Sequence, residues 1–181
     1  MTVTTVSRNA LYIALAAAAS CMPRADAAAV GFTIPAYLKP PASQTLAFEA
    51  RAVGVQIYTC SAAKIDGAPP AWTLKAPDAV LYDAGGARLG THYAGPTWEG
   101  SDGSKVVGQV KASATPSPDA IAWLLLDVKS AQGDGVFGQI TAIQRLETEA
   151  GKAPADGCDT ASLGQEVRMP YKAVYRFFKA A

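Results

Sequence analysis

Short hydrophobic segments that alternate with polar residues run through most of this chain, and turn-forming residues separate them. From Val53 onward these segments are rich in Val, Ile, Tyr, Thr and Trp, with Gly, Pro and Asp clusters between them. That pattern is typical of β-strands joined by turns, and we predict roughly eight to ten of them. In the first, 53–60, side chains of Val53, Val55 and Ile57 share one face.

The expected strands are 53–60, 72–75, 79–83, 88–93, 104–111, 121–128, 139–147 and 171–178. In the last of them Tyr171, Tyr175 and Phe177 fall on one face. The segment 121–128 is apolar throughout, which favours a central strand buried on both faces, with a short buried helix as the alternative. Strands and helices do not alternate, so the fold class is all-β: a single-domain β-sandwich or barrel, with those two architectures left open.

The N-terminal residues 1–27 are expected to be a signal peptide. Arg8 supplies positive charge, 10–19 is apolar, and Ala25-Asp26-Ala27 fits a cleavage site. A transmembrane anchor is disfavoured, because ten residues of helix span about 15 Å, half of the hydrocarbon core. A lipid anchor at Cys21 is the weaker alternative. The protein is therefore expected to be exported, to the periplasm or fully secreted.

Residues 28–181 are expected to form one mostly-β domain, because a chain of this size fits a single core. Within it, 28–49 is expected to be a proline-rich arm and 50–181 the core. The arm contains Pro35, Pro40 and Pro41, and proline fixes φ and lacks a backbone donor. Regular structure is therefore not expected there.

Export would leave two cysteines, Cys60 and Cys158, in an oxidising compartment. An even pair favours one disulfide, with two buried free thiols as the alternative. Two cysteines and one histidine cannot build a closed structural zinc site, which needs four such ligands. We expect no metal.

Composition and motifs exclude several classes of protein. The net charge is +1 and basic residues do not cluster, which disfavours nucleic-acid binding. Walker and GxGxxG motifs are absent, so no nucleotide cofactor is expected, and no other cofactor is indicated. The sequence also lacks the GxSxG motif of serine hydrolases, which disfavours that class of enzyme.

The densest polar segment, 91–105, contains the candidate binding residues His92, Tyr93, Trp98, Glu99, Asp102 and Lys105. The only histidine could act as a base, the acids as its partners, and Trp98 as a stacking platform. Against this, Gly-Pro and Asp-Gly form turns, His92 would cap a strand end by hydrogen bonding, Trp98 would fill the core, and Asp102 would make a local turn bond. Catalytic residues stay unknown at this point.

Aromatic side chains offer a second location for a ligand. If the strands close into a barrel, they could line a cavity; otherwise they form the core. These residues are Trp72, Trp98, Trp123, Tyr58, Tyr93, Tyr171, Tyr175 and Phe177.

Five ordered blocks of sequence carry a resemblance to a known family. They are GVQIYTC (54–60), THYAGPTWEGSDGSKVVG (91–108), AWLLLDV (122–128), ITAIQRLETEAGKAPADGCD (140–159) and YKAVYRFF (171–178). The chain resembles the domain of unknown function 3455 family. The resemblance implies export and a bridge between Cys60 and Cys158, but no activity.

These observations predict a non-enzymatic exported β-domain. It would bind a small ligand, a glycan or an envelope partner through the loop from His92 to Lys105. The alternative is a small hydrolase or metal-assisted enzyme that uses His92 with Glu99 or Asp102. A purely structural envelope component is the third hypothesis, and the oligomeric state is unknown.

Overall fold

The computed structural model describes residues 1–2 and 33–181, and those from Thr33 onward lie in one compact unit. The expected signal peptide and the Cys21 anchor fall almost entirely outside the described residues, so both stay predictions. No helix within the described residues has the length and apolar character needed to cross a membrane.

Eight antiparallel strands form one closed barrel, in which each strand pairs with the next and β8 pairs with β1. The strands are β1 (Gln44–Ser61), β2 (Ala71–Tyr82), β3 (Arg88–Tyr93), β4 (Thr97–Gly100), β5 (Lys105–Ala114), β6 (Trp123–Gln132), β7 (Ile140–Ala150) and β8 (Glu166–Ala180). The prediction of an all-β fold is confirmed. Of the two architectures left open, the structure is a barrel.

Connections between strands alternate between two ends of the barrel. The loops 83–87, 101–104 and 133–139 join the strands at one end, which we call the lower end and where β8 also finishes. The turn 94–96 and the loop 115–122 lie at the opposite end, which we call the mouth. β3 and β4 are short, so the barrel wall is lowest on their side of the mouth.

Aromatic side chains fill the lower part of the barrel. Phe137 comes from the loop between β6 and β7, is fully buried, and lies with its ring centroid 5.0 Å from that of Phe177 and 5.6 Å from that of Phe48. Trp98 packs edge-on against Phe177 from above, at 6.1 Å. These rings close the lower end, so a ligand can enter only from the mouth or through a wall.

Alternation along β8 matches the prediction, because Tyr171, Tyr175 and Phe177 all point inward and are buried. Alternation along β1 has the opposite sense from the one its apolar residues indicate. Val53 is 48 % exposed, whereas Gln56 is buried inside the barrel. β1 thus turns its β-branched residues outward and its polar or small residues inward, which leaves polar groups in the interior.

The N-terminal segment covers the outer face of β6 and β7. A single 3-10 turn, η1 (Ala36–Leu38), inserts Leu38 against Trp123, Leu125 and Leu146. This contact covers the outer face of β6, so that Leu125 and Leu126, which point to opposite faces of this strand, are both buried. β1 begins at Gln44, nine residues before the first strand expected at 53–60.

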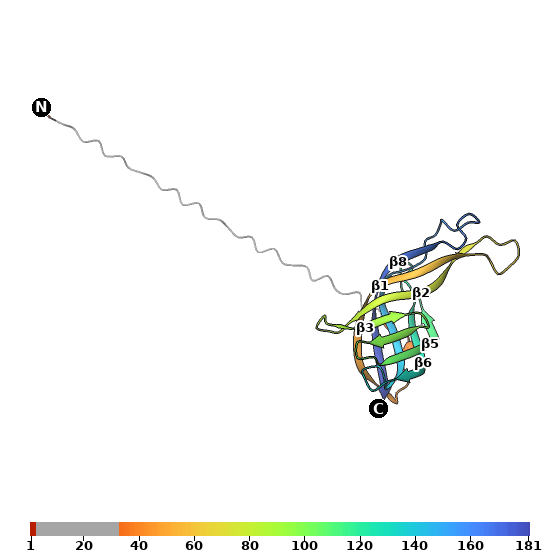
Figure 1. Ribbon diagram of the computed structural model, residues 1–181. Helices are drawn as coiled ribbons and strands as arrows, with labels where there is room; N and C mark the ends of the chain where they lie inside the picture. Colours follow the sequence, from red (N-terminus) through yellow and green to blue (C-terminus); the bar gives the residue numbers. More distant parts are fainter. Residues whose placement is uncertain (3–32) are drawn as a thin grey trace. The chain divides into compact units, whose positions relative to one another are not determined.

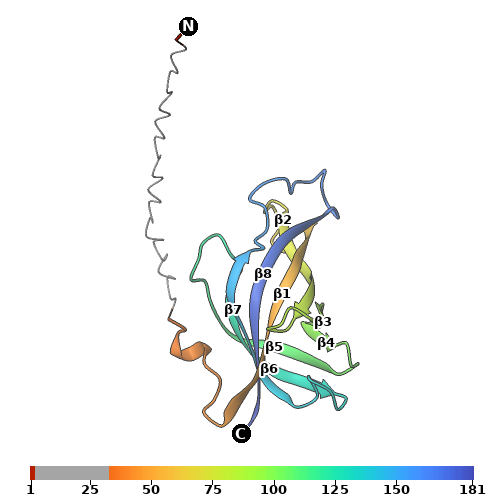
Figure 2. The same ribbon diagram turned by 90° about the vertical axis from the view of Figure 1, so that its left-hand side faces the viewer.

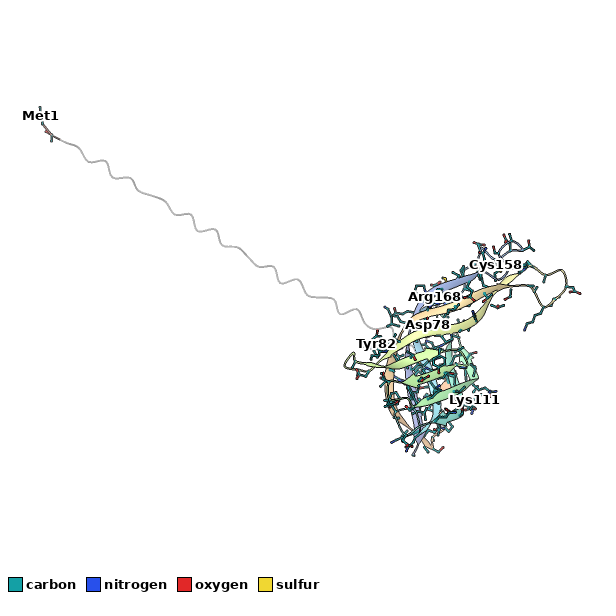
Figure 3. All side chains as sticks on the ribbon, in the orientation of Figure 1. Met1, Asp78, Tyr82, Lys111, Cys158 and Arg168 are labelled. Carbon is teal, nitrogen blue, oxygen red and sulfur yellow. A yellow bond between two sulfur atoms is a disulfide. The ribbon has the colours of Figure 1, made fainter. Side chains whose placement is uncertain are left out.

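β1, β2 and β8 continue beyond the barrel as a three-stranded extension (Figures 1 and 2). β1 departs from the barrel at a bulge between Ile57 and Tyr58, since bulges bend a strand. The disulfide between Cys60 and Cys158 lies in this extension, with Cα atoms 5.3 Å apart, and Figure 3 shows Cys158 near its far end. The pair expected from the cysteine count is therefore bonded in the structure.

Candidate functional site

The six residues predicted from the segment 91–105 do not form one site. β3 and β4 pair with His92 opposite Trp98 and with Tyr93 opposite Thr97, and neighbouring side chains point to opposite faces. His92 and Trp98 therefore point into the barrel. Tyr93 and Glu99 point outward.

The outward residues form a small surface cluster. The Tyr93 hydroxyl donates to Glu99 Oε2 at 2.5 Å, and Lys105 Nζ lies 3.2 Å from the same oxygen. The hydrogen bonds from Tyr93 and then from Lys105 lower the pKa of Glu99. Glu99 is thus an ionised and already partnered acid, separated by the sheet from His92.

Asp102 lies at the lower end of the barrel. Its Oδ1 accepts hydrogen bonds from the Ser104 hydroxyl at 2.6 Å and from the Ser104 backbone N–H at 2.9 Å, and its Oδ2 accepts one from Val136 N–H at 2.8 Å. These bonds, with the Ser104 hydroxyl first, lower its pKa. They tie the β4–β5 turn to the loop that inserts Phe137, which is a structural role.

Trp98 offers no open face to a ligand. The indole is 1 % exposed, stacks on the His92 ring with centroids 4.3 Å apart, and meets Tyr175 edge-on at 5.3 Å. Within residues 33–181 its Nε1 has no acceptor. The stacking platform expected at Trp98 is therefore part of the packed interior.

His92 is a buried, neutral imidazole. It is 2 % exposed, and Nδ1 lies 2.9 Å from the carbonyl oxygen of Thr97. Burial lowers the pKa of His92 to about 3, with the nearby Arg145 guanidinium acting in the same direction and the Thr97 carbonyl opposing it. Among the described residues no carboxylate bonds to this ring, so the acid–base pairing expected of a hydrolase lacks its second member.

His92 lines a cavity of about 390 Å³ in the barrel mouth. Residues of β1, β2, β3, β5, β6 and β7 and of the β3–β4 turn line it. The polar residues on it are Gln56, Lys75, His92 and Arg145, and the apolar ones include Leu74, Pro77, Pro96, Val110 and Leu124. Leu74 and Val110 are more than half exposed and form an apolar rim. The volume lies in the range of small-molecule sites.

Arg145 is the charged group of this cavity that lacks an ion-pair partner among residues 33–181, because Lys75, the other cation on the lining, pairs with Glu166. Arg145 follows Ile143 on β7 with the same inward orientation, and its Nε donates to the Ala122 carbonyl at 3.0 Å. No ion pair in residues 33–181 involves Arg145. A half-buried guanidinium therefore faces the mouth without an acidic partner.

Further hydrogen-bonding groups lie near Arg145. Gln56 Nε2 is buried and lacks a hydrogen-bond partner within residues 33–181. The hydroxyls of Tyr171 and Tyr175 are also buried and interact with each other, and that of Tyr175 also interacts with Arg145. Burial raises the pKa of both tyrosines, and for Tyr175 the charge of Arg145 opposes that effect. Buried polar groups normally find partners, so the unpaired Gln56 amide beside Arg145 makes this cavity a candidate ligand site.

Sequence analysis identified His92 and the tyrosines but missed Gln56 and Arg145. Both stand within expected strands, where a polar residue is normally assigned to the solvent face. The available signal was their position: Arg145 falls two residues after the apolar Ile143, on the face that must point inward if Ile143 does.

A larger hollow, of about 490 Å³, lies on the outer face of β7, β8, β1 and β2. Its charged residues are exposed and partly paired: Lys172 Nζ lies 2.9 Å from Glu149 Oε2. An exposed pair has little to gain from a ligand. In the part of the chain that the structure describes, no group of three His, Cys, Asp or Glu side chains could hold a metal ion.

The fold and the mouth define the class: a small closed β-barrel with a cation inside one end. The chain belongs to the family described as Protein of unknown function (DUF3455), whose model matches residues 41–179. The resemblance carried by the five sequence blocks is thereby confirmed. Searches of the curated proteins and of the solved structures gave no match.

Proposed function

We propose that this protein binds a small organic carboxylate in the barrel mouth, without catalysing a reaction on it. The observation that carries the proposal is Arg145, a guanidinium that faces the cavity and has no acidic partner among residues 33–181. Charges removed from water are normally paired. A carboxylate supplies the missing charge and matches the planar donor geometry of a guanidinium.

The surroundings of Arg145 favour an anion with an apolar body. Gln56 Nε2, on the same cavity, is a further donor without an acceptor, and carboxylate oxygens accept several hydrogen bonds. The exposed rim residues Leu74 and Val110 would cover apolar atoms of the ligand. Of the residues predicted from the segment 91–105, the proposed binding surface therefore includes only His92. The other polar residues on it, among them Gln56 and Arg145, come from the barrel interior.

Export after signal cleavage remains part of the proposal. The Cys60–Cys158 disulfide supports it, because disulfides persist mainly in oxidising compartments. A glycan or an envelope component is less well supported, since Trp98 has no free face for a sugar.

Binding of benzoate, compared with its neutral isostere benzamide, tests the proposal by titration calorimetry. The wild-type protein should bind benzoate at least tenfold more tightly than benzamide. Arg145→Gln should abolish that preference, while Arg51→Gln, an exposed arginine on β1, should retain it. Equal affinities of the wild type for both probes, or a preference that survives Arg145→Gln, would exclude this function.

A further inference from the structure

We infer that the ligand of the mouth carries a hydroxyl group in addition to its carboxylate, and that this hydroxyl donates a hydrogen bond to Nε2 of His92. The inference rests on the proposed function and specifies its ligand as a hydroxy acid. Arg145 and His92 line the same cavity and supply opposite hydrogen-bonding roles.

The hydrogen bond at Nδ1 determines what Nε2 can do. A carbonyl oxygen only accepts, so Nδ1, at 2.9 Å from Thr97 O, carries the proton and donates it. In a neutral imidazole the other nitrogen is then an acceptor. Within residues 33–181 nothing donates to Nε2.

Packing holds this acceptor in a fixed orientation. The imidazole stacks nearly parallel on the Trp98 indole, at an interplanar angle of 12°. Tyr175 contacts it edge-on, with ring centroids 5.1 Å apart. The ring cannot rotate to offer a donor without breaking the bond to Thr97. A fixed acceptor on the cavity discriminates between ligands, because a bound ligand without a donor leaves it unpaired.

The charge of Arg145 decides which donor fits. An ammonium group would be repelled by the guanidinium on the same cavity, since like charges in a partly buried site disfavour each other. A neutral hydroxyl donates without that penalty. The ligand therefore combines a carboxylate, a hydroxyl and an apolar framework small enough for about 390 Å³.

Hydroxybenzoates provide rigid probes of this arrangement. The 2-, 3- and 4-hydroxybenzoates vary the spacing between carboxylate and hydroxyl, and each has a methoxybenzoate partner that lacks the donor. We expect at least one isomer to bind the wild-type protein about tenfold more tightly than both benzoate and its methoxy partner, which corresponds to about 1.4 kcal/mol. His92→Phe, which keeps a ring on Trp98, should remove that advantage, so that the favoured hydroxybenzoate and its methoxy partner bind the variant with about equal affinity.

Nitrogen NMR gives a second measurement that does not depend on a variant. His92 is the only histidine, so a chain without a histidine tag gives one imidazole signal set. The favoured hydroxybenzoate should shift Nε2 in the direction of hydrogen-bond acceptance, and benzoate should not.

The outcomes separate the two proposals. If benzoate binds through Arg145 but no hydroxyl improves affinity or shifts Nε2, the hydroxy-acid inference is overturned and the carboxylate site stands. If the gain survives His92→Phe with Nε2 unshifted, the acceptor is another group and the inference is again overturned. If no acid binds, the proposed function fails and the inference fails with it.

Discussion

His92 couples the stability of the barrel to pH in a range where few other groups titrate. Burial lowers its pKa from 6.5 to about 3, so at intermediate pH the unfolded chain binds a proton that the folded chain does not. Stability is therefore complete above pH 6.5 and falls as the pH decreases toward 3. Between pH 7.5 and 5.0 we expect a loss of about 2 kcal/mol in the free energy of unfolding, because a folded-state pKa of about 3 leaves the buried ring unprotonated throughout this range.

Urea unfolding at both pH values measures this loss, and His92→Phe is the control. The variant should be less stable at pH 7.5, because the Thr97 carbonyl loses its donor. Its stability should nevertheless be nearly constant between the two pH values. A wild-type protein with no loss over that range would show that His92 is protonated in the fold or accessible to water.

At this scale the sequence identified residues better than it identified their surroundings. The sequence analysis singled out the only histidine and weighed a structural role for it beside a catalytic one. Arg145 and Gln56 did not stand out, because charged or amide side chains in a strand are usually solvated. Their inward orientation follows from pairing register across the sheet, which is set by partners distant in sequence.

At the scale of elements, Asp102 joins two loops at the lower end of the barrel. It accepts bonds from Ser104 and from Val136 N–H, next to the buried Phe137. Asp102→Ala leaves those donors without partners, and we expect a loss of about 1–3 kcal/mol. Asp134→Ala, at an exposed position in the β6–β7 loop, should change the free energy of unfolding little. Urea unfolding compares the two; equal effects would mean that the loop is held by Phe137 alone.

The N-terminal arm is a second element whose contribution can be isolated. Leu38 is fully buried against Trp123 and Leu146, whereas the adjacent Tyr37 is 60 % exposed. Leu38→Ala should destabilise the protein by about 2–4 kcal/mol, and Tyr37→Ala by less than about 0.5 kcal/mol. Chemical unfolding of both variants tests this. A Leu38→Ala loss as small as that of Tyr37→Ala would mean that the arm does not stabilise the barrel.

Element boundaries were predictable where turn residues mark them and unpredictable where tertiary contact decides. The segment 121–128 was identified as a doubly buried strand, but nothing in it indicates that Leu38 supplies the outer cover. Conversely, the alternation of Val53, Val55 and Ile57 favours an apolar inward face, whereas the barrel turns that face outward. The interior at that level is narrow and already holds Tyr171, which leaves β1 the complementary small and polar residues.

At the scale of the whole molecule, closure of the barrel is the property that the sequence left open. Sandwiches and barrels share the same strand lengths and turns, and the pairing of β1 with β8 joins segments more than a hundred residues apart. Closure is also what forms the site. It brings Gln56, His92 and Arg145 from three separate strands to one cavity.

The disulfide stabilises the molecule without contacting that cavity, and this separation gives a final prediction. Cys60 and Cys158 are 98 residues apart, so the bond restricts the unfolded chain, and the chain-entropy model predicts a contribution of about 4.5 kcal/mol. The bond lies in the extension, outside the barrel.

We therefore expect Cys60→Ala/Cys158→Ala to lower the free energy of unfolding by about 3–5 kcal/mol and to leave benzoate affinity within twofold of the wild type. Urea unfolding and calorimetry on the same samples measure both quantities, with reduced wild-type protein as the matched control. A variant that keeps its stability would contradict the entropic account, and one that folds but loses benzoate would mean that the extension shapes the mouth.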